Sequence, residues 1–233
     1  MKPSPKLCVA LDVPTPEKAR ALVTETASHA GLYKIGSQLF AAGGPEFVRE
    51  LVRDGRGIFL DLKFHDIPNT VASAVAAAAE LGVRYVDVHA SGGGAMIEAA
   101  ARALAASRSA TQLLAITVLT SHRPETLAEI GVLGSIEENV VRLARLAKDS
   151  GAHGVVASPH EVALVRRACG PGFLIVTPGI RPQGAPRGDQ ARAATPSGAI
   201  RAGSDVLVVG RPIIEAPDPK GAAEAILREI QAA

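Results

Sequence analysis

The amino-acid sequence predicts an α/β fold, a (β/α)8 TIM barrel in which residues 1–233 form a single domain. Eight short apolar segments alternate with segments of helical pattern along the whole chain. These apolar segments are continuous runs, which is typical of parallel strands that are covered on both faces. No linker, low-complexity tract or change of composition divides the chain. The alternative is a doubly wound sheet, which more often uses fewer strands.

Each strand is expected where an apolar run lies between turn-forming residues. The first run ends at Asp12, just before Pro14, and the second contains Lys34. The expected strands cover residues 7–11, 32–36, the first half of 58–70, 85–89, 113–119, 153–157, 173–177 and 206–209.

Helices are expected between these strands. Pro16 and Pro68 fall where proline suits the first turn of a helix, since the N–H that it lacks has no partner there. A Gly-rich segment, Ser91 followed by glycines at 92–94, precedes an Ala-rich helix, and Gly131 and Gly134 interrupt the helical region that ends at residue 149. The other expected helices cover residues 15–30, about 45–52, 68–81, 159–168 and about 219–230.

Composition argues against several classes of partner. Aromatic residues make up only 3% of the chain and tryptophan is absent, which weakens a role in stacking on nucleic-acid bases. The net charge is +2 without a basic run, so we expect no nucleic-acid partner, although a small anion remains possible. The longest apolar run, residues 71–79, is too short to cross a membrane, and the N-terminus lacks the apolar core of a signal peptide. Two cysteines without a C-x-x-C motif fit a reduced, cytoplasmic setting.

The segment 58–70 carries the most unusual pattern. Residues two apart on a strand share a face, so Asp61 and Lys63 are expected to point the same way, with Asp66 following where the strand ends. Three charges at the end of a buried strand are costly unless they serve a purpose. A structural ion pair with a helix-capping Asp66 is the plainer alternative.

Other polar residues fall at the same end of the predicted barrel, where the active sites of such barrels lie. Asp12 follows strand one, Lys34 lies within strand two and Thr120 closes strand five. Singly, Asp12 suits a turn and Lys34 suits an edge strand, but a closed barrel has no edge. The acids and lysines together therefore predict a functional array of alternating charge, formed by Asp12, Lys34, Asp61, Lys63 and Asp66.

The connections after strands seven and eight predict a phosphate site. Residues 178–190 form a long loop rich in glycine and proline, and Gly210 and Arg211 follow strand eight. Loops at these two places commonly bind phosphate in such barrels. Arg181 and Arg211 supply charge and forked donors, and Gly210 lets the backbone approach an anion.

The histidines do not predict a metal centre. His89 at the end of strand four is the most plausible ligand, but no second histidine is expected nearby, so we favour a structural role and expect no metal. The carboxylates around Lys63 favour its charged form, which argues against Schiff-base formation. A charged lysine instead stabilises developing negative charge and donates a proton. The residues thus indicate carbanion or enolate chemistry on a sugar phosphate or nucleotide.

Five segments resemble the orotidine 5′-phosphate decarboxylase family, in the family's order. They are 61–70 (DLKFHDIPNT), 118–121 (VLTS), 177–184 (TPGIRPQG), 189–190 (DQ) and 209–212 (VGRP). This resemblance implies conversion of orotidine 5′-phosphate to UMP and carbon dioxide in de novo pyrimidine biosynthesis, without metal or organic cofactor.

The same resemblance implies the roles of individual residues. Lys63 would donate a proton to C6 of the pyrimidine, Asp61 would lie near the departing carboxylate, and Lys34 with Asp12 would contact the ribose. Asp66 would reach the site of the other subunit of a homodimer, together with Ile67 and Thr70. The remaining substrate contacts would be Thr120 and Ser121 at the pyrimidine, Arg181, Gln190, Gly210 and Arg211 at the phosphate, and Gln183 on a closing loop.

Two alternatives remain open from the residues alone. A related phosphosugar barrel, such as a metal-dependent decarboxylase, aldolase or epimerase, would share the D-x-K-x-x-D pattern. A non-catalytic phosphate-binding barrel would need only the anion site after strands seven and eight, and would not require the charge array.

Overall fold

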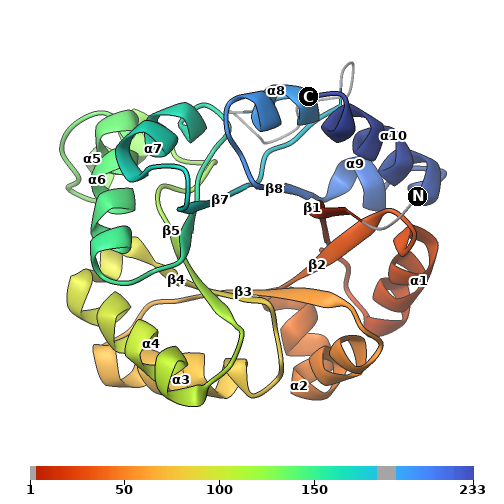
Figure 1. Ribbon diagram of the computed structural model, residues 1–233, viewed down its shortest axis with the longest axis horizontal. Helices are drawn as coiled ribbons and strands as arrows, with labels where there is room; N and C mark the ends of the chain where they lie inside the picture. Colours follow the sequence, from red (N-terminus) through yellow and green to blue (C-terminus); the bar gives the residue numbers. More distant parts are fainter. Residues whose placement is uncertain (1–3, 183–192) are drawn as a thin grey trace.

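Eight parallel strands close into a barrel in which each strand pairs with the next and β8 pairs with β1 (Figure 1). The predicted (β/α)8 barrel is therefore confirmed. The computed structural model describes residues 4–182 and 193–233. Its strands are β1 (Ser4–Ala10), β2 (Ala30–Gly36), β3 (Gly57–Phe64), β4 (Tyr85–His89), β5 (Gln112–Ile116), β6 (Gly154–Val156), β7 (Leu174–Thr177) and β8 (Val206–Val209).

Helices form an outer ring around this barrel (Figure 1). In the described part of the chain none is both long enough and apolar enough to cross a membrane. Their bounds are α1 (Pro16–Thr26), α2 (Ser37–Arg53), α3 (Pro68–Ala79), η1 (Ala90–Gly92), α4 (Gly94–Ser107), α5 (Pro124–Glu129), α6 (Ile136–Asp149), α7 (Val162–Cys169), α8 (Pro196–Arg201), α9 (Arg211–Ile214) and α10 (Pro219–Gln231).

The core has two layers because the side chains of a strand alternate between its faces. The larger layer lies between the strands and the helices, and a smaller cluster fills the barrel interior, including Leu32, Phe59 and Tyr85. Two residues further along these same three strands, towards their carboxyl ends, come Lys34, Asp61 and Asp87. The apolar interior therefore ends in a layer of charged residues.

Several expected boundaries are wrong. Strand five ends at Ile116 and not at residue 119. Its neighbour β6 ends at Val156, which pairs with Ile116, so the residues after Ile116 have no strand partner on that side. Helix α1 ends at Thr26 because β2 already begins at Ala30.

Two further helices begin elsewhere than expected, and two were not expected at all. Helix α2 begins at Ser37 and has a kink at Gly44, where φ is 63°. Pro45 directly follows this kink, so the proline marks the start of only the second half of the helix. Helix α7 begins at Val162, three residues later than expected. The short helices α8 and α9 have no counterpart among the expected elements.

Candidate active site

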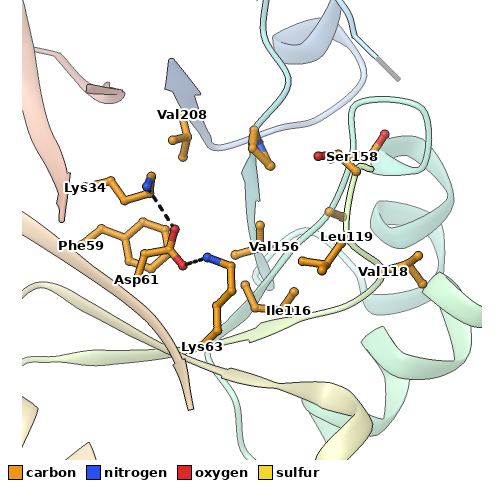
Figure 2. Close-up of a pocket in the computed structure, with 13 residues that line it drawn as sticks. Lys34, Phe59, Asp61, Lys63, Ile116, Val118, Leu119, Val156, Ser158 and Val208 are labelled. Carbon is orange, nitrogen blue, oxygen red and sulfur yellow. Dashed lines mark hydrogen bonds and ion pairs between the residues drawn. The ribbon is translucent and has the colours of Figure 1, made fainter. Parts of the chain in front are cut away.

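A cavity of about 180 Å³ opens at the carboxyl ends of the strands. One side carries charged groups, and the opposite side is mainly apolar, with Thr120 and Ser158 as polar exceptions. Figure 2 shows the Asp61 carboxylate between the amines of Lys34 and Lys63. Pockets of this kind, apolar with a few convergent polar groups, are the usual places for a small ligand.

Four side chains form what we call the charged row: Asp12, Lys34, Asp61 and Lys63. Lys34 Nζ lies 2.9 Å from Asp12 Oδ1 and 3.2 Å from Asp61 Oδ2. The other oxygen of Asp61 pairs with Lys63 Nζ. The strands thus bring together four of the five residues of the predicted array.

Within the charged row, Lys34 and Asp61 favour each other's ionised form. Burial by itself would raise the pKa of Asp61, but Lys34, a hydrogen bond with Asp87, and Lys63 outweigh it and lower the pKa to about 2. Burial by itself would lower the pKa of Lys34, yet Asp61 and Asp12 together raise it above its ordinary value. A carboxylate held between two ammonium groups results.

The backbone at Lys63 departs from regular strand geometry. Its φ is +52°, in the left-handed region, and the register between β3 and β4 shifts between Leu60 and Phe64. The simple alternation that we used to place Asp61 and Lys63 on one face is therefore broken here. The two side chains nevertheless meet, and Lys63 Nζ pairs with Asp61 Oδ1.

Two polar residues near this cavity were missed in the sequence. Asp87 is fully buried and accepts a hydrogen bond from the Lys63 backbone N–H at 2.8 Å. A lone acid inside the apolar run of β4, two residues beyond Tyr85, was the available signal. Ser158 is 1% exposed and lines the cavity just after β6, but a serine after a short strand carries little signal by itself.

The segment after β3 points away from the charged row of its own chain. Asp66, Ile67 and Thr70 are all exposed, with Ile67 at 67%. Asp66 Oδ1 accepts the Ile67 N–H at 2.6 Å, and Asp66 makes no ion pair within residues 4–182 and 193–233. The fifth member of the predicted array therefore lies apart from the other four in a single chain.

The expected pyrimidine contacts separate in the structure. Thr120 is half-buried and lines the cavity, although it lies in the loop after β5 and not on the strand. Ser121 is exposed and does not contribute to the lining.

Three of the expected phosphate residues, Arg181, Gly210 and Arg211, follow the ends of β7 and β8. Arg181 is only 9% exposed and donates to the Ile180 carbonyl at 2.9 Å. Gly210 lies beside the charged row, because a Cβ there would be 3.6 Å from Asp12 Oδ2. Arg211 is half-buried at the start of α9. Gln183 and Gln190 lie outside the described residues.

The expectation that His89 has no histidine neighbour is wrong. The rings of His65 and His89 lie 5.6 Å apart, and both line a second cavity of about 430 Å³ together with His122. Burial, followed by the nearby His65 and Lys63, lowers the pKa of His89. Within the described ranges, no three His, Cys, Asp or Glu side chains are grouped so that they could hold a metal ion.

A (β/α)8 barrel with ammonium and carboxylate groups beside an apolar cavity, at the carboxyl ends of its strands, defines an enzyme of the barrel class. An ammonium group in such a place is chemically able to stabilise developing negative charge and to donate a proton. Comparison with known proteins narrows the class. The profile of the orotidine 5′-phosphate decarboxylase / HUMPS family matches residues 5–226, and the chain belongs to this family.

Individual relatives agree with this placement. The chain is 54% identical over 226 residues to the orotidine 5′-phosphate decarboxylase of Anaeromyxobacter sp. (strain K), covering 97% of this chain and 98% of the relative. It is 54% identical over 229 residues to the enzyme of that name from Halorhodospira halophila, covering 98% and 97%. The crystal structure of orotidine 5′-phosphate decarboxylase from Lactobacillus acidophilus matches with a TM-score of 0.86 and 40% identity over 99% of both chains.

Proposed function

We propose that this protein decarboxylates orotidine 5′-phosphate to UMP and carbon dioxide, with no metal or organic cofactor. The observation that carries this proposal is the charged row, in which Asp61 holds the Lys63 ammonium beside an apolar cavity. Family membership and the named relatives support the choice of substrate. A place in de novo pyrimidine biosynthesis and a cytoplasmic location remain predictions.

The chemistry requires a cation at one carbon atom. When the bond between C6 and the carboxylate carbon breaks, carbon dioxide leaves and an electron pair stays on C6, in the plane of the ring. No adjacent π-acceptor delocalises that pair, so a fixed ammonium is the group that stabilises it. In the proposed reaction Lys63 supplies this charge, transfers its proton to C6 and regains a proton from water.

The rest of the charged row keeps Lys63 in this state. Asp61 lies between Lys34 and Lys63 and would stand next to the departing carboxylate of the substrate. A second carboxylate near C6 favours protonated Lys63, and Lys34 keeps Asp61 itself ionised. Lys34 also reaches Asp12 at 2.9 Å, and this exposed end of the row would meet the ribose hydroxyls.

Contacts to the rest of the nucleotide would come from the loops. Thr120 in the cavity, with Ser121, would contact the pyrimidine, and the apolar wall suits the faces of the ring. The phosphate would lie between the loops after β7 and β8, held by Arg181, Gln190, Gly210 and Arg211, with Gln183 on the loop that closes. Binding energy from this remote group can order the site around the reacting carbon.

We also propose that the active unit is a homodimer in which Asp66 completes the partner's site, with Ile67 and Thr70 beside it. Support comes from exposure: these residues follow the catalytic strand directly, yet all three face outward, and Ile67 is 67% exposed. The charged row also lacks in its own chain the second acid of the D-x-K-x-x-D motif.

The direct test is turnover of orotidine 5′-phosphate in the presence of a metal chelator, followed by the loss of orotate absorbance. Turnover that is unaffected by the chelator is the expected result. A folded protein that turns over only when divalent metal is present, or that acts instead on pentose or hexose phosphates, would overturn the proposal in favour of a metal-dependent phosphosugar enzyme.

A further inference from the structure

Asp87 is an acid in the middle of β4 that lies outside the D-x-K-x-x-D motif. Its side chain is fully buried, two residues beyond Tyr85 of the interior cluster. Its Oδ1 accepts a hydrogen bond from the Lys63 backbone N–H at 2.8 Å. Asp87 therefore contacts the backbone of the lysine on which the proposed reaction depends.

That hydrogen bond holds Lys63 in an unfavourable conformation. Among the described residues other than glycine, only Lys63 and Arg108 have positive φ. Arg108 is the C-cap of α4, where a left-handed residue is common, whereas Lys63 lies within a strand. A left-handed lysine is strained and persists only where the surroundings enforce it. The bond from Asp87 is the visible constraint.

The second oxygen of Asp87 needs a proton. Oδ2 is buried and receives no hydrogen bond from any donor in the described residues. Its charged neighbours are Asp61 and Lys63 on β3, and its pairing partner on β5 is Leu114. Asp61 is paired with both Lys34 and Lys63, which stabilise its charged form. Of two adjoining buried carboxyl groups, the one without cationic partners keeps the proton, and here that group is Asp87. Burial, then the charge of Asp61, raises the pKa of Asp87 well above its usual range.

We propose that Asp87 is a positioning residue for Lys63: its Oδ1 fixes the Lys63 amide, and its Oδ2–H donates a hydrogen bond to the Asp61 carboxylate. Asp87 then acts on the reaction through the two residues of β3 and not through the substrate. This inference rests on the proposed function for its kinetic consequences, since Lys63 must be the proton donor for its position to limit turnover. Its claim about the proton stands independently of the substrate.

Two substitutions separate the hydrogen bonds from the charge. In Asp87→Asn the amide oxygen still accepts from Lys63 and the NH2 group still donates to Asp61, so the variant reproduces a neutral acid. We expect its kcat to stay within about 3-fold of the unmodified protein, with the same pH profile. Asp87→Leu has a similar volume and neither group, so we expect kcat to fall about 100-fold, while KM changes little because the phosphate contacts are remote.

A matched control accounts for loss of stability. Asp205→Leu breaks an ion pair with Arg166. Asp205 lies just before the start of β8, whereas the cavity opens at the carboxyl ends of the strands, so this change should lower the midpoint of unfolding without changing kcat. A folded Asp87→Leu variant with kcat within about 3-fold of the unmodified protein would overturn the positioning role. An Asp87→Asn variant as slow as Asp87→Leu would show that the negative charge matters, and would overturn the assignment of the proton.

Carbon-13 NMR of the aspartate carboxyl groups gives a readout that does not depend on turnover. The Asp87 signal, assigned by its absence in Asp87→Asn, should keep the shift of a neutral acid between about pH 5 and 8. The shift of an ionised carboxylate at neutral pH would overturn the inference. If the protein fails to turn over orotidine 5′-phosphate while this signal stays neutral, the proposed function fails and the Asp87 proton is retained.

Discussion

Replacing Lys34 with methionine removes the central cation of the charged row and keeps an unbranched chain that fills similar space. Lys34 Nζ lies 3.2 Å from Asp61 Oδ2, and the side chains of the pair are only 12% and 10% exposed. Breaking a buried pair leaves an uncompensated charge and costs about 3–5 kcal/mol. The two side chains are still partly exposed, and Asp61 retains its ion pair with Lys63. We therefore expect the lower end of this range, a fall of about 3 kcal/mol in the free energy of unfolding at neutral pH.

The loss should depend on pH in a defined direction. In the unmodified protein the pKa of Asp61 is lowered to about 2, so Asp61 contributes stability that is complete above its unfolded pKa and is lost as the pH falls towards 2. Without Lys34, burial raises the pKa of Asp61, and the variant takes up a proton at a higher pH than the unmodified protein does. The stability difference between the two proteins should therefore be largest at neutral pH and shrink on acidification.

Urea unfolding at several pH values measures this difference, with an Asp61→Asn change in both backgrounds as the second arm of a double-mutant cycle. The cycle should give a coupling energy of about 1–3 kcal/mol between the two sites, since Lys34→Met leaves no buried charge unpaired once Asp61 is an amide. A loss below about 1 kcal/mol at neutral pH, or one that is unchanged on acidification, would refute the argument that Lys34 is what keeps Asp61 ionised.

Four further changes test other parts of the structure. Lys63→Ala should lower kcat by at least about 1000-fold while circular dichroism stays unchanged, and near-normal turnover would exclude Lys63 as the proton donor. Arg211→Ala should weaken UMP binding about 10-fold or more by calorimetry, with a smaller effect on turnover than Lys63→Ala, and unchanged affinity would remove it from the phosphate site. Mixing inactive Lys63→Ala and Asp66→Ala subunits should restore about a quarter of full activity, because a mixed dimer regains one intact site, whereas no recovery would contradict a shared site. Arg166→Met should cost about 2–3 kcal/mol in urea unfolding, since its guanidinium donates to Asp205 and to four backbone carbonyls, while exposed Arg102→Met should cost under about 0.5 kcal/mol; equal losses would contradict this structural role.

Much of the barrel was predictable because local pattern and global fold agree. Eight continuous apolar runs describe strands that are buried on both faces, and the regular alternation with helices leaves few topologies. Charges that interrupt such runs are rare, so Lys34, Asp61 and Lys63 stood out and could be assigned to the carboxyl ends of their strands. The distances between them follow from the neighbouring positions of β2 and β3 in the barrel.

The errors arise where tertiary context decides. The end of β5 depends on the length of β6, a segment more than 35 residues later, and no local signal at 117–119 reports it. The left-handed backbone of Lys63 cannot be read from a lysine in an apolar run, because the side chain of lysine itself disfavours it. The rings of His65 and His89 come together because β3 and β4 pair again at Phe64 and Val88 after the register shift, and His65 and His89 are the next residues of the two segments.

The charges of the site also explain why the phosphate end should matter for the proposed reaction. The charged row contains two lysines and two aspartates, so with a neutral Asp87 its formal charge is zero. A neutral row offers little net attraction for the carboxylate of the proposed substrate. Affinity must then come from groups remote from C6, which the arginines after β7 and β8 are able to supply. In the proposed reaction the row is then free to favour the state after carbon dioxide departs, when the charge that remains on C6 lies against the Lys63 ammonium.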